Sequence, residues 1–245
     1  MLRALLLLTA FLPLQAFSAE LRLAVASNFL ITAEKLAYAF EQETGHEVII
    51  SSGSTGKLYT QIRAGAPFDL FLAADAERPE RLVNEGYALP ESRVTYALGQ
   101  LAIWSRKANV DLEPEALLQQ PPKRLALANA ATAPYGRAAE QAISYLGLTD
   151  LPSTQVRGEN ISQTYQLVYA GAAEVGFIAY SLYTARPSGT IWQIPTEAYD
   201  PIEQQMVVLK RSTNLELAYQ WHEWMLSEGR TIIAAEGYAL EAPNA

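Results

Sequence analysis

Apolar positions along the chain follow two periods, and the change from one to the other predicts strands and helices. An unbroken apolar run at 21–26 is typical of a buried strand. Apolar residues then recur at helical spacing up to Gly45, which is suited to end a helix. The following segments predict strands at 47–51 and 68–73 and helices at 58–64 and 77–85. Strands alternating with helices predict a mainly parallel sheet covered on both faces.

A long β-prone stretch at 94–104, divided by Gly99, predicts a strand that leaves one sheet and enters another. The same alternation then restarts, with strands at 124–128, 154–157 and 175–179 and helices at 136–146 and 162–172. Residues 205–210 predict a strand that crosses back, followed by helices at 215–225 and 231–235. We therefore predict an α/β fold of two lobes, each a mixed, mainly parallel sheet flanked by helices, with a ligand cleft between them: 20–98 with 206–245, and 99–205.

The segment before the first strand has the three parts of a secretory signal peptide. Arg3 is followed by an apolar run at 4–14 and by a small-residue exit at 16–19. The run is shorter than the roughly 20 residues that a spanning helix needs, and Pro13 lies within it. We expect residues 1–19 to be cleaved and the mature chain to be exported.

Charge and composition narrow the function classes. The full chain has 18 basic and 26 acidic residues, so loss of Arg3 leaves 17 minus 26, a net charge of −9. Such a chain is expected to repel nucleic acid and anionic lipid. It has no cysteine and only two histidines, His46 and His222, which makes thiolate and histidine-rich metal sites improbable. Stability is expected to come from core burial alone.

Two turns in the first part carry small polar residues where strands meet helices. In the first, Ser27 or Asn28 is a natural N-cap and leaves backbone N–H groups pointing outward. The second, residues 51–57, resembles a phosphate-binding loop, but the Walker pattern fails because Ser51 and Leu58 stand at two required positions. A hydroxyl-rich helix start that binds a smaller anion stays open. The alternative for the first turn is that its residues only cap the helix, and for the second that it is a flexible turn.

Two further helix starts lie in the second part. Pro134 and Tyr135 enter one helix, and Asn160 can cap another so that the N–H of Ile161 becomes free. Four such starts in one two-lobed chain favour a convergent anion site of neutral donors, because helix N-termini present free N–H groups and partial positive charge. Lys57, the one cation near a turn, is expected in solvent.

Several motifs resemble the periplasmic molybdate-binding proteins of ABC transporters, which have the type II periplasmic binding fold. They are residues 24–28, 51–58, 61–75, 134–136 and 175–180, of which 61–75 is the most specific. The resemblance implies that a tetrahedral oxyanion, molybdate or tungstate, is bound by Ser27, Asn28, Ser54 or Thr55, Tyr135 and Ile161. Many members also use a tyrosine hydroxyl after the 175–179 strand, where Ala179 stands here with Tyr180 beside it.

The resemblance implies capture without chemistry: a periplasmic monomer that closes over its anion and docks on the membrane permease of an ABC transporter, with no cofactor. The same fold could serve sulfate, phosphate or a ferric–anion complex, for which Tyr180 and Tyr183 offer a tyrosine pair. A hydrolase is disfavoured because no histidine lies beside a candidate nucleophile turn. A carboxylate facing a dianion would oppose binding, so we expect Asp75 to cap or pair locally.

Overall fold

The computed structural model describes residues 19–240. The predicted signal peptide, apart from Ala19, lies outside the described residues. Within 19–240, none of the helices combines the length and the apolar character that crossing a bilayer would require.

The first sheet has five strands in the order β2-β1-β3-β10-β4. β1 is parallel to β2 and β3, whereas β10 runs antiparallel to both β3 and β4. Side chains of the central strand β1 alternate between two cores: Leu23 and Val25 pack on one face and Ala24 on the other. The strands are β1 (Glu20–Ala26), β2 (Glu47–Gly53), β3 (Leu70–Leu72), β4 (Val94–Gly99) and β10 (Ile202–Val208).

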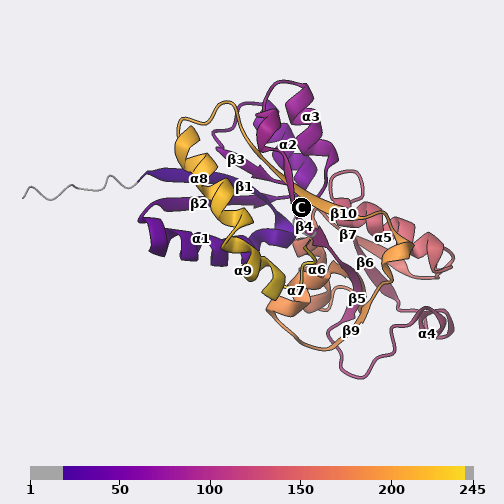
Figure 1. The fold of residues 1–245 in the computed structure, drawn as a ribbon. Helices are drawn as coiled ribbons and strands as arrows, with labels where there is room; N and C mark the ends of the chain where they lie inside the picture. The colour runs from indigo at the N-terminus through magenta and orange to yellow at the C-terminus, as the bar shows by residue number, and fades with distance from the viewer. Residues whose placement is uncertain (1–18, 241–245) are drawn as a thin grey trace, which may run out of the picture.

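Helices cover both faces of the first sheet. The C-terminal helices α8 and α9 return to lie beside α1 and share one core with it, whereas α2 and α3 cover the opposite face (Figure 1). Trp221 and Trp224 pack edge-on against Phe40, as their helical spacing predicts, and Gly45 ends α1 with a left-handed φ of 74°. The helices are α1 (Leu30–Thr44), α2 (Thr55–Arg63), α3 (Glu77–Asn84), α8 (Leu215–Leu226) and α9 (Gly229–Ala235). This sheet and its helices form the first α/β unit.

The second sheet begins directly after β4, with only Gln100 between that strand and β5. Its order is β7-β6-β8-β5-β9, with β5 antiparallel to both neighbours and β6 parallel to β7 and β8. The predicted crossover at Gly99 and the mixed, mainly parallel character of both sheets are confirmed. The strands are β5 (Leu101–Ser105), β6 (Arg124–Ala128), β7 (Thr154–Gly158), β8 (Val175–Ala179) and β9 (Thr190–Gln193).

The second α/β unit differs from the sequence prediction in its short elements. α4, α7 and β9 were not predicted, because four to six residues are too few to show a period. The returning strand β10 begins at Ile202, so the expected lobe boundary at 205/206 falls inside it. The helices are α4 (Pro114–Gln119), α5 (Pro134–Tyr145), α6 (Ile161–Tyr169) and α7 (Tyr180–Ala185), and short 3-10 turns are η1 (Ser27–Phe29), η2 (Pro90–Ser92) and η3 (Thr196–Ala198).

His222 in α8 makes stability depend on pH. Its Nε2 lies 2.9 Å from the Ser92 carbonyl oxygen, which can only accept, so Nε2 carries the proton. Burial lowers the pKa of His222 below its ordinary value. The unfolded chain then binds more protons below about pH 6.5, so this contribution is complete above that pH and is lost as pH falls through the lower folded-state pKa.

We therefore expect the free energy of unfolding to fall between pH 7.5 and 5.5, and to fall less in His222→Gln, whose amide can donate to Ser92 without titrating. Urea denaturation of both proteins at the two pH values measures this. An equal fall in both would contradict the assignment, because the other titrating groups are common to both.

Candidate functional site

A small cavity lies between the two α/β units, where strands end and helices begin. Its volume is only about 10 Å³, far below the roughly 300 Å³ at which pockets for drug-sized ligands begin, so it has room for no more than one small solute. Six of the seven predicted site residues line it, and Tyr180 does not. The lining residues are Ala26, Ser27, Asn28, Gly53, Ser54, Thr55, Ala74, Ala133, Pro134, Tyr135 and Ile161.

The turn after β1 brings Ser27 and Asn28 to the cavity. Neither side chain caps the helix that follows, which differs from the expected N-cap. Asn28 instead donates its side-chain amide to Gln204 Oε1 at 2.8 Å and to the Tyr238 hydroxyl at 3.1 Å. This ties the turn into the interior of the protein.

The turn after β2 separates the roles of Ser54 and Thr55. Ser54 occupies the N-cap position of α2, yet its hydroxyl makes no cap bond. Ser54 Oγ is buried and, among the described residues, has no hydrogen-bond partner, although buried hydroxyls are nearly always paired. Thr55 Oγ1, in contrast, accepts from the Ala74 N–H at 3.1 Å. The Ser54 hydroxyl is therefore the one without a bond among the described residues, whereas the Thr55 oxygen already accepts from the chain.

Two helix starts of the second α/β unit complete the cavity wall. Pro134 and Tyr135 are the first residues of α5, and Ile161 is the first residue of α6. The Asn160 side chain accepts from the Gln163 N–H at 2.9 Å, as the sequence predicted, and the N–H of Ile161 lies before the first intrahelical bond. Helix starts of this kind supply free N–H donors and a partial positive charge, which favour an anion.

The cavity wall is neutral. No Asp, Glu, Lys, Arg or His stands among its lining residues. Its one titratable group is Tyr135, whose pKa burial raises well above the ordinary value, so the phenol keeps its proton. An anion here would be held by hydroxyl and backbone donors and not by a counter-ion.

Contacts between the two α/β units surround the cavity. The Gly56 N–H donates to the Thr132 carbonyl at 3.0 Å, and Ser162 Oγ donates to the Ser27 carbonyl at 2.7 Å. Lys57 is half exposed, as expected, and pairs with Glu159 of the second unit. The units are therefore joined at the helix starts that form the wall.

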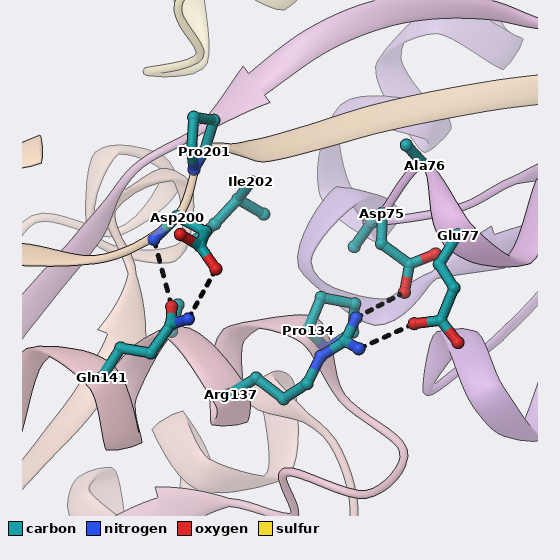
Figure 2. A pocket seen from close by; sticks show the side chains of 11 residues that line it. Asp75, Ala76, Glu77, Pro134, Arg137, Gln141, Asp200, Pro201 and Ile202 are labelled. Atoms are coloured by element: carbon teal, nitrogen blue, oxygen red, sulfur yellow. Dashed lines mark hydrogen bonds and ion pairs between the residues drawn. The ribbon is translucent and has the colours of Figure 1, made fainter.

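A larger pocket next to the cavity holds an ion-pair network that also joins the units (Figure 2). Arg137 of α5 reaches Glu77 at 2.7 Å and Asp75 at 3.2 Å. Asp75 also accepts from the Arg78 N–H at 3.1 Å and pairs with the Arg78 guanidinium. The local pairing expected for Asp75 is confirmed, and two guanidinium groups offset its charge beside the cavity.

Tyr180, the first residue of α7, does not line the cavity. Its ring stacks on that of Tyr183 with centroids 6.1 Å apart, and it lies against the turn at Gly237. A different phenol approaches the first turn: Tyr238 Oη donates to the Asn28 carbonyl at 2.8 Å. Within residues 19–240 no cluster of three or more acidic, histidine or cysteine side chains is placed to hold a metal ion.

Gln204, Tyr238 and Arg137 were missed by sequence reasoning. Gln204 carried a usable signal, since an amide inside a strand that is otherwise buried needs a partner. Tyr238 and Arg137 carried none, because their contacts join segments 210 and about 60 positions apart.

This fold and cavity are those of a solute-binding protein, and the family model of bacterial extracellular solute-binding proteins matches residues 21–239. The molybdate-binding protein ModA of Azotobacter vinelandii is 41% identical over 92% of each chain, and that of Rhodobacter capsulatus is 40% identical over 94% of this chain and 92% of its own. The solved periplasmic molybdate-binding protein of A. vinelandii superposes with a TM-score of 0.86, covering 91% of this chain and 100% of that one at 40% identity.

The chain belongs to the ModA family of bacterial extracellular solute-binding proteins. The predicted two-lobed type II periplasmic binding fold is thereby confirmed. Its relatives are binding proteins and not enzymes.

Proposed function

We propose that this protein captures molybdate or tungstate in the periplasm and delivers the anion to the permease of an ABC transporter. The observation that carries the proposal is the buried, unpaired hydroxyl of Ser54 in a neutral cavity walled by helix starts. Such a hydroxyl costs free energy unless a ligand accepts from it. An oxyanion accepts from it and from the free helix N–H groups together.

We propose Ser27, Asn28, Ser54, Tyr135 and Ile161 as the ligand-binding residues, with Thr55 supporting the wall and Tyr180 taking no part. Ser27 and Ser54 would offer hydroxyls, and Asn28, Tyr135 and Ile161 backbone N–H groups. No cofactor is assigned, because the anion is the cargo. Size would select against sulfate, which presents the same charge in a smaller shell, since the donors are fixed by helix starts.

The two predicted lobes, 20–98 with 206–245 and 99–205, would close over the anion. The second crossing would lie before Ile202, because β10 from Ile202 onward belongs to the sheet of the first unit. The acidic chain would act as a monomer, without nucleic acid, and would meet its permease in the closed form.

Titration calorimetry of the mature protein with molybdate, tungstate, sulfate and phosphate tests the proposal. We expect tight binding of molybdate and tungstate and at least tenfold weaker binding of the others, roughly 1.4 kcal/mol. Heat from sulfate or phosphate alone would show that another oxyanion is the cargo. Binding of ferric citrate alone would support the ferric alternative.

Loss of Arg137 is expected to weaken capture modestly. Arg137→Gln removes the ion pairs to Asp75 and Glu77 that join the two units in Figure 2. Surface ion pairs contribute about 0.2–1 kcal/mol each, so the loss of two pairs is expected to lower molybdate affinity roughly two- to thirtyfold, and less so in high salt.

Arg157→Gln is the matched control. Arg157 is 43% exposed against 44% for Arg137, and its partner Glu140 lies in the same unit. Calorimetry at low and high salt compares the two variants. Equal losses of affinity in both would rule out a role for Arg137 in closure.

A further inference from the structure

A buried chain of hydrogen bonds runs behind the cavity and centres on Gln204. This residue of β10 is fully buried, and Met206 and Val207 further along the strand are buried apolar residues. Its Oε1 accepts from the Asn28 side-chain amide at 2.8 Å and from the Tyr96 hydroxyl at 3.2 Å. Its Nε2 donates to the Tyr135 hydroxyl at 3.5 Å. One amide thus contacts two of the residues that line the cavity.

The two cavity residues come from different units. Asn28 follows β1 in the first unit, and Tyr135 opens α5 in the second. Gln204 stands on the strand that connects them, two residues after the pairing of Ile202 with Gly99. A side chain at Gly99 would collide with the Tyr135 hydroxyl and crowd the Gln204 amide. The absence of a side chain at Gly99, where the chain crosses between the sheets, therefore leaves room for the contact between Gln204 and Tyr135.

The hydrogen bonds of Gln204 involve the side-chain ends of Asn28 and Tyr135 and not their backbone N–H groups. The hydroxyl of Tyr135 bonds to Gln204, whereas the donor assigned to the anion is the Tyr135 backbone N–H at the helix start. The side-chain amide of Asn28 likewise bonds to Gln204 and Tyr238, which leaves its backbone N–H for the cavity. Gln204 does not itself line the cavity. Any effect on capture must act through the placement of these two turns.

We propose that Gln204 is a positioning residue for anion capture, which fixes the Asn28 and Tyr135 turns relative to each other when the units close. The inference rests on the proposed function. Asn28, Tyr96 and Gln204 all belong to the first unit, so opening leaves their bonds intact. Of the bonds that Gln204 makes, the one to Tyr135 crosses between units, so closure would form it. Gln204 thus stabilises the closed, anion-holding form and slows release of the anion.

Gln204→Met tests this, with Gln205→Met as the matched control. Gln205 is the next residue of β10 and is also buried, but its amide bonds to Thr95 and Arg93 in the first unit. We expect Gln204→Met to weaken molybdate binding roughly 5- to 30-fold, mainly through faster release measured by stopped-flow tryptophan fluorescence. Gln205→Met should stay within about twofold of the unchanged protein.

Tyr135→Phe removes the hydroxyl and keeps the backbone N–H, so it tests the contact between Tyr135 and Gln204 without altering Gln204. It should also speed release, and the effect of Gln204→Met should shrink in the Tyr135→Phe background, because the two substitutions remove one shared contact. Tyr135→Phe that binds and releases molybdate like the unchanged protein would overturn the inference, even if Gln204→Met fails to fold. Strictly additive effects would also overturn it.

The two proposals fail in different ways. An unchanged protein that does not bind molybdate sinks the proposed function. If the unchanged protein binds and both glutamine variants bind equally well, the positioning role of Gln204 alone is refuted.

Discussion

Replacing Ile161 by proline is expected to weaken molybdate binding roughly 10- to 150-fold while the fold is kept. Proline removes the backbone N–H, and a hydrogen bond to a charged group contributes about 1.5–3 kcal/mol. The first position of a helix tolerates proline, because its N–H has no intrahelical partner. Asn160 already has extended backbone, with φ −150° and ψ 174°, which suits a residue before proline.

Ile161→Ala provides the control for lost packing, because the Ile161 side chain is buried and proline also shortens it. Alanine keeps the N–H, so it should lower thermal stability and leave affinity within a few-fold. Calorimetry gives the two affinities and circular dichroism the two melting temperatures. Equal affinity of the proline and alanine variants would remove the Ile161 N–H from the site.

Ser54→Ala should act in opposite directions on stability and binding. Its hydroxyl is buried and has no partner within residues 19–240, so removing it should keep or raise the free energy of unfolding of the ligand-free protein. With molybdate present the same change removes a donor to the anion, and we expect roughly 10- to 100-fold weaker binding. Melting curves with and without molybdate measure both effects on one sample.

Thr55→Val is the contrasting variant at the next position. The Thr55 hydroxyl accepts from the Ala74 N–H, so its loss should destabilise the ligand-free protein by about 1–3 kcal/mol. If Ser54→Ala destabilised the protein and left molybdate affinity unchanged, the assignment of Ser54 as the anion's hydroxyl donor would be wrong.

Most of the architecture was predictable because it follows from the spacing of apolar and polar residues within each segment. The alternation of Leu23, Ala24 and Val25 between two cores requires helices on both faces of β1. The four helix starts were equally local, since a polar residue after a strand indicates where free N–H groups lie. The sequence could therefore place these turns near one another without any knowledge of distances.

The parts that could not be predicted depend on contacts between distant segments. The Thr55 oxygen is bonded and the Ser54 oxygen is not because Ala74, which lies 19 positions from Thr55, reaches Thr55 in the folded chain. Tyr180 lies beside the C-terminal turn at Gly237, a segment that is distant in the sequence. The pattern of apolar residues along one segment does not indicate which distant segment will pack against it.

The neutral wall of the cavity has a consequence for how capture responds to acidity. Its one titratable lining group, Tyr135, keeps its proton far above neutral pH because burial raises its pKa. The binding equilibrium therefore contains no proton exchange by the cavity residues near neutral pH. Uptake should follow the protonation of the solute itself, so that acidity regulates the supply of the dianion and not the charge of the cavity that receives it.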